Sequence, residues 1–137
     1  MLIRLPFAFI LGLTIYMIAM MMTTYDVVLS MIFQPVMGAI ITVLGLGVVC
    51  LAGSPLLITG IWNQWRRVWW LPVLITFAGC VACIISWHPS LREKVINPET
   101  HAEVESFHPA LICGGWFASM FGVMFCPLGL RGDRRWV

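Results

Sequence analysis

The sequence predicts an all-α polytopic membrane protein: one domain over residues 1–137, with four transmembrane helices and both termini in the cytoplasm. Three observations lead to this prediction. Apolar residues make up 61% of the chain and charged residues only 10%, against roughly 45–50% and 25% in soluble domains. The apolar residues form four long runs without charged side chains, and the basic residues gather on one side of these runs.

Each run is long enough to cross a bilayer, because about 20 mostly apolar residues span about 30 Å of hydrocarbon. The predicted spans are residues 5–22, 36–58, 68–87 and 109–130. The first run resembles a signal peptide, but no convincing cleavage site of small residues follows it, so we expect it to be retained.

The stretch between the first two spans, residues 26–35, is too short to cross. We expect it to extend the first span or to lie along the outer surface. Proline suits the first turn of a helix, so Pro35 is the predicted start of the second span.

Six of the eight basic residues are predicted to lie on one side of the membrane. They precede the first span, join the second to the third and follow the fourth: Arg4, Arg66, Arg67, Arg131, Arg134 and Arg135. The positive-inside rule therefore places both termini in the cytoplasm, and the expected location is the bacterial inner membrane. A net charge of +2 is too small to indicate a nucleic-acid partner.

Two pairs of similar stretches indicate an internal duplication. The entry to the first span, Leu5-Pro-Phe, is similar to the entry to the third, Leu71-Pro-Val. The stretch that begins Phe33-Gln-Pro is similar to the one that begins Phe107-His-Pro, and both continue into a helix rich in small residues. A two-helix hairpin used twice would give a parallel repeat about an axis along the membrane normal. Chance similarity between apolar helices is the alternative.

Small residues indicate where the helices pack, since membrane helices associate mainly through close backbone approach. In the fourth span Gly114, Ala118 and Gly122 are spaced by four, and Gly115 widens this surface. Gly45 has the same role in the second span. These surfaces are expected to face either the rest of the subunit or a partner.

Cys80 and Cys83 form a Cys-x-x-Cys pair in the third span. Residues three apart share a helix face, and the pair is predicted to lie within hydrocarbon, where a thiolate would be uncompensated. We therefore expect a packing role, with transport or handling of a soft metal or thiol-reactive ion as the alternative. Four spans with such a pair resemble the outline of some mercury-transport membrane proteins. Those carry the pair on the first span, however, so no family is assigned.

The outer loop, residues 88–108, is the one sizeable polar segment of the sequence. Its "PETHAEVES" stretch is predicted to form a short helix with His101 and Glu105 on one face. Together with His88 and His108 these residues could hold a divalent metal ion. The alternative is that the His-Pro pairs serve only as turns and helix starts.

No ionisable residue lies well inside a span, which argues against a pump or a transporter of charged substrates. The sequence therefore favours a small non-catalytic membrane subunit that stabilises a larger membrane complex or a homo-oligomer. A membrane immunity or exclusion factor is a further alternative to soft-metal handling. No catalytic residue or cofactor is predicted, a metal stays an open option, and membrane lipids are expected to bind.

Overall fold

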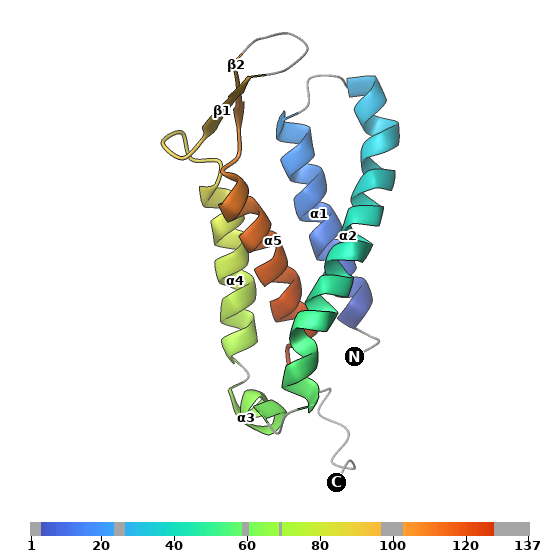
Figure 1. Cartoon of the computed structure of the whole chain (residues 1–137), viewed down its shortest axis with the longest axis vertical. Coiled ribbons are helices and arrows are strands. Elements are labelled where there is room, and N and C mark those ends of the chain that lie inside the picture. Colours follow the sequence, from blue (N-terminus) through green and yellow to red (C-terminus); the bar gives the residue numbers. More distant parts are fainter. Residues whose placement is uncertain (1–3, 24–26, 59–60, 69, 97–102, 128–137) are drawn as a thin grey trace.

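Figure 1 shows a computed structural model of the chain, in which residues 4–23, 27–58, 61–68, 70–96 and 103–127 are described. The helices are α1 (Arg4–Thr23), α2 (Val27–Ile58), α3 (Ile61–Arg67), α4 (Trp70–Ile85) and α5 (Pro109–Met124). Two strands, β1 (Glu93–Ile96) and β2 (Glu103–Ser106), form an antiparallel pair between α4 and α5.

The long helices run up and down beside one another, and α5 lies at the centre of the bundle (Figure 1). It packs most extensively against α4 and also contacts α1 and α2, while α1 and α2 contact each other. The start of α1, the short helix α3 and the end of α5 lie at one end, and the β1–β2 hairpin lies at the other (Figure 1). The four long helices follow one another along the chain in the same order as the four predicted apolar segments.

The predicted helical class is confirmed, and two helices are long and apolar enough to cross a membrane. These are α1, of 20 residues, and α2, of 32 residues. Helices α4 and α5 have 16 residues each, so each rises about 24 Å. They are apolar but shorter than the predicted spans at 68–87 and 109–130, and residues 128–130 lie outside the described residues.

The predicted start of the second span is wrong. Helix α2 begins at Val27, and Pro35 lies inside it. Proline removes one backbone donor and disfavours a helix interior, but the residues before it are apolar and continue the helical run. Since 32 residues rise about 48 Å, α2 is much longer than the roughly 30 Å that a bilayer crossing needs.

The predicted short helix in the outer loop is also wrong where the structure describes it, because residues 103–106 form strand β2. The register places Val95 opposite Val104 and Lys94 opposite Glu105. Within β2, the apolar Val104 lies between Glu103 and Glu105, an alternation that suits a strand. Residues 97–102, including His101, lie outside the described residues.

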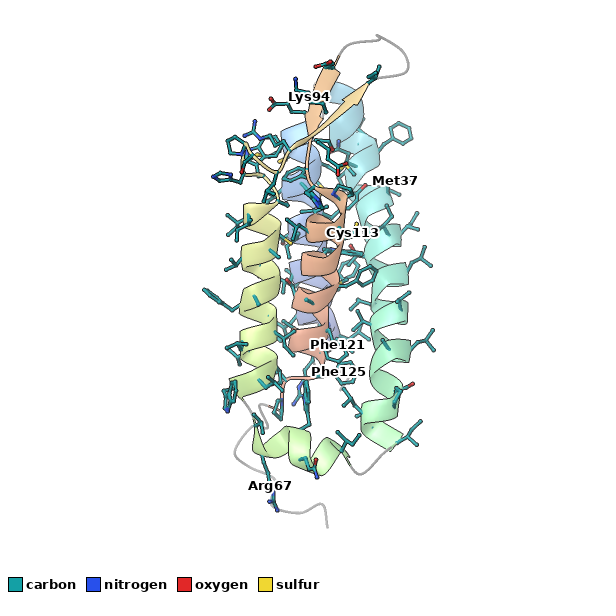
Figure 2. All side chains as sticks on the ribbon, turned by 60° about the vertical axis from the view of Figure 1, so that its left-hand side comes forward. Met37, Arg67, Lys94, Cys113, Phe121 and Phe125 are labelled. Carbon is teal, nitrogen blue, oxygen red and sulfur yellow. The ribbon has the colours of Figure 1, made fainter. Side chains whose placement is uncertain are left out.

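The tightly packed core is near the α3 end of the bundle. Its buried side chains come from three helices and the turn that follows α5: Ala8, Leu46, Val49, Met120, Met124 and Phe125. Trp65 of α3 closes this end, because its indole Nε1 donates a hydrogen bond to the Phe125 carbonyl oxygen at 2.9 Å. Figure 2 shows Phe121 and Phe125 toward the Arg67 end and Lys94 at the opposite end.

Candidate functional site

Helices α4 and α5 meet through glycines that leave no room for side chains. A Cβ atom built on Gly79 would lie 2.6 Å from the carbonyl oxygen of Gly115, and one built on Gly115 would lie 2.6 Å from that of Gly79. A Cβ on Gly122 would meet the Pro72 carbonyl oxygen at 2.6 Å. This close backbone approach is how small residues join membrane helices.

The predicted packing residues of α5 divide between two of its faces, and Gly45 of α2 packs against the same helix. Gly115 and Gly122 are buried against α4, and Gly45 lies against the Trp116 ring, 2.5 Å from where its Cβ would be. Ala118 is half-buried, whereas Gly114 is exposed and has open space around it. The contact with α4 thus uses the face of Gly115 rather than that of Gly114.

The cysteine pair lies on the face of α4 that is turned toward α5. The Cys80 Sγ atom lies 3.7 Å from Ser119 Oγ, and the Cys83 thiol donates to the Ile112 carbonyl oxygen at 3.8 Å. All five cysteines are free; Cys113 is exposed and Cys126 is buried. The sequence correctly placed the two thiols of the pair on one face.

Two apolar cavities flank the contact between α1 and α5 in the half of the bundle near the hairpin. One has a volume of about 370 Å³ and includes Tyr16, Cys113 and Trp116 in its lining. The other, of about 330 Å³, is lined by Cys80, Cys83, Trp87 and others. They share four lining residues, Ile15, Ala19, Phe107 and Ile112, so they are two lobes on either side of one wall. Sequence reasoning gave no signal for them.

Hydroxyl side chains in the described helices bond to backbone carbonyls of their own helix. Thr14, Thr42, Thr76 and Ser119 each donate to the carbonyl oxygen four residues earlier, at 2.6–2.9 Å. Ser54 bonds in the same way three residues back, at 2.8 Å. This pairing satisfies each hydroxyl within its own helix, and it leaves these hydroxyls committed to structure.

The residues of the predicted metal site face different partners. His88 Nδ1 lies 2.7 Å from Ser90 Oγ, and Glu105 accepts a hydrogen bond from Arg92. His108 Nε2 lies 4.0 Å from a Glu93 carboxylate oxygen, while its Nδ1 is buried without a partner among the described residues. His101 lies outside them. Within the described ranges, no three His, Cys, Asp or Glu side chains form a group that could hold a metal ion.

Arg92 joins the hairpin to the end of α4 beside the second cavity. Its guanidinium carbon lies 4.3 Å from the centre of the Trp87 ring, and its Nε donates to the Trp87 carbonyl oxygen at 3.0 Å. The Trp87 ring also packs on Phe107, with 4.6 Å between ring centres. Charged, aromatic and apolar groups therefore follow one another from the hairpin down into the bundle.

The chain matches no protein-family model, no curated protein and no solved structure. Its function is therefore argued from the geometry described above.

Proposed function

We propose that this chain is a four-span integral membrane protein with both termini in the cytoplasm, and that it acts as a non-catalytic subunit. It would pack against a larger membrane complex or against further copies of itself. The observation that carries the proposal is the exposure of apolar side chains along helices that are packed against one another.

Helices α1 and α2 are mostly uncovered. Only 11% of the residues in the apolar window of α1 are buried, and 33% of those in α2. Large apolar side chains on three helices are well exposed, for example Phe7 (64%), Leu51 (75%) and Phe77 (70%). Water-soluble monomers rarely expose contiguous apolar patches above a few hundred Å², whereas lipid solvates such surfaces without penalty.

The shorter helices α4 and α5 can cross the bilayer only together with the residues that lie beyond their ends. Trp87 follows α4 at the hairpin end, and Trp70 begins α4 with its ring half exposed. Aromatic rings of this kind prefer the headgroup region, and a bilayer accommodates a short apolar stretch by modest local thinning. The orientation is supported by Arg67, which Figure 2 shows at the end opposite Lys94 of the hairpin. Arg4 is the first residue of α1, which starts at that same end (Figure 1).

Exposed glycines on the outside of the bundle support a partner. Gly47 lies on the uncovered side of α2, between the exposed side chains of Leu44 and Leu51, and a Cβ built on it would meet nothing within 4 Å. Gly114 is equally open on α5. In membrane proteins small residues concentrate where helices touch, so these two positions mark surfaces on which another helix can approach closely.

The partner is tested by extracting the tagged chain with a mild detergent and identifying co-purifying chains by mass spectrometry. We expect either a second membrane protein in fixed proportion or a stable multiple of the 15.4 kDa chain. A monodisperse monomer without companions would contradict the subunit role.

Membrane insertion is tested separately. The chain should resist alkaline carbonate extraction, and a cysteine that replaces Lys94 should react with a thiol reagent from the side of the membrane opposite to a cysteine that replaces Arg67.

Handling of a soft metal or thiol-reactive ion is the second candidate, because Cys80 and Cys83 line the same cavity. Thiol sulfur is a preferred ligand of soft metals. Replacing both cysteines with alanine separates the candidates. Loss of metal-dependent growth or uptake with intact assembly would favour metal handling, and unchanged metal response would favour the subunit role.

A further inference from the structure

The two cavities lie where the bundle is loosely packed. Near α3 the buried side chains of Met120, Met124 and Phe125 fill the space between helices. Near the hairpin, Ile15 and Ala19 of α1 and Ile112 of α5 instead form a thin wall with about 370 Å³ on one side and about 330 Å³ on the other. Both volumes fall in the range of about 300–1,000 Å³ typical of ligand sites.

Hydrocarbon is the occupant that this lining favours. An unfilled space would forfeit dispersion contacts with every side chain around it, and water would find few polar partners there. Two lobes of similar size on either side of one wall match two parallel acyl chains joined at one end. Phe107 lines both lobes and directly follows β2, so the joined end belongs at the hairpin.

The hairpin offers mixed charges for a headgroup. Arg92 reaches Trp87, which lines the smaller lobe, and its Nε and Nη1 donate to Trp87 and Glu105. Its Nη2 makes no hydrogen bond within the described residues, and arginine is well suited to phosphate. The Glu105 carboxylate beside it is 56% exposed. The same face of the hairpin carries Lys94, which pairs with Glu103 at 3.2 Å, so its charges balance. A phosphate joined to an ammonium group finds a partner for each of its charges there, whereas an anionic headgroup leaves Glu105 without an ammonium partner.

We propose that the chain binds one two-chain zwitterionic phospholipid of the phosphatidylethanolamine type. One acyl chain occupies each lobe, the phosphate lies at Arg92 and the ammonium group lies at Glu105. This inference rests on the proposed membrane insertion, but not on the proposed subunit role.

The test uses the full chain, purified in detergent and stripped of lipid. Native mass spectrometry then measures the binding of added diacyl phosphatidylethanolamine, its single-chain lyso form and diacyl phosphatidylglycerol. We expect one diacyl phosphatidylethanolamine per chain. The lyso form should bind at least about tenfold more weakly because one lobe stays empty, and phosphatidylglycerol should also bind at least about tenfold more weakly.

Two variants report on the two parts of the site. Ala19→Phe places a ring at the wall shared by both lobes and should weaken binding at least about tenfold. Ala52→Phe is the matched control, since Ala52 is exposed on α2 and lines neither lobe. Arg92→Gln changes a residue outside the helices. It should weaken the binding of phosphatidylethanolamine and of its lyso form by a similar factor, so that the preference for the two-chain lipid changes little. Circular dichroism verifies that each variant is folded.

Equal affinity for the lyso form, equal affinity for phosphatidylglycerol or undiminished binding by folded Ala19→Phe would each overturn the proposal. If Ala19→Phe does not fold, undiminished binding by Arg92→Gln overturns it instead. A chain that resists carbonate extraction but binds no lipid would refute the lipid site alone. A chain released by carbonate would refute membrane insertion and the lipid site together.

Discussion

Replacing Gly115 with alanine is expected to separate α4 from α5. The added Cβ would lie 2.6 Å from the Gly79 carbonyl oxygen and 2.7 Å from the Cys83 sulfur, and real Cβ atoms essentially never approach within 3.0 Å. A side chain could rotate away, but the oxygen belongs to the helix backbone. The two helices must therefore move apart by several tenths of an ångström along their contact, and neighbouring pairs lose dispersion contacts with them.

Overpacking of this kind typically costs about 1–3 kcal/mol. The ratio of folded to unfolded protein should therefore fall between about fivefold and 150-fold, at 1.4 kcal/mol for each factor of ten. The measurement is equilibrium unfolding in mixed detergent micelles with increasing dodecyl sulfate, followed by tryptophan fluorescence and circular dichroism. An intact folding transition at lower denaturant is the expected result.

Gly114→Ala is the matched control, because it makes the same chemical change one residue earlier in α5, where nothing lies within 4 Å. Its free energy of unfolding should be unchanged or higher by up to about 1 kcal/mol, because alanine is favoured over glycine in a helix interior. The reasoning would be refuted if Gly115→Ala were as stable as Gly114→Ala, since the two variants share composition and helix propensity and differ only in the face that they alter.

Three further predictions use the same assay. Gly45→Ala should destabilise the chain by less than Gly115→Ala, because the group it meets is the movable Trp116 ring. Gly47→Ala, in open space, should be neutral or slightly stabilising, and a larger loss of stability for Gly47→Ala than for Gly45→Ala would contradict this reasoning. Trp116→Phe removes the 2.8 Å hydrogen bond from the indole to the Gly12 carbonyl oxygen and should lower the free energy of unfolding by about 0.5–1.5 kcal/mol. An unchanged free energy of unfolding would show that this bond does not stabilise the fold. Arg92→Ala breaks the hairpin ion pair and should cost up to about 1 kcal/mol, with the ionic part disappearing at about 1 M salt; a salt-independent loss would assign its role to packing on aromatic groups.

The helical segments could be predicted from the sequence because long apolar runs without charged side chains are typical of helices. The ends of the segments were less predictable. Proline is a residue that favours the first turn of a helix, yet the eight residues before Pro35, from Val27 to Gln34, are already helical. The preference of proline for the first helical turn does not outweigh the need of an apolar stretch to satisfy its backbone internally.

The hairpin shows how two periods compete in a short polar segment. The apolar Val104 between Glu103 and Glu105 gives the alternation of a strand, but His101 and Glu105 are also spaced for one helix face. Four residues cannot decide between these patterns, and the choice depends on a partner strand. That partner, β1, places Val95 opposite Val104 and lets Lys94 pair with Glu103 at 3.2 Å, a contact between residues nine apart that local spacing does not reveal.

The contact between α4 and α5 shows why a pattern of small residues does not by itself identify the face on which a helix packs. Gly114 and Gly115 are adjacent, so each begins a stripe of small residues on α5, and the two stripes are turned by about 100°. Which one meets α4 depends on where α4 carries its own glycine, and Gly79 lies opposite Gly115. The same docking leaves Gly114 exposed and sets how closely α5 can approach α1, because Trp116, next to Gly115, is held to the Gly12 carbonyl of α1. The lobes beside that contact are thus a consequence of three-helix geometry, and no property of a single segment predicts them.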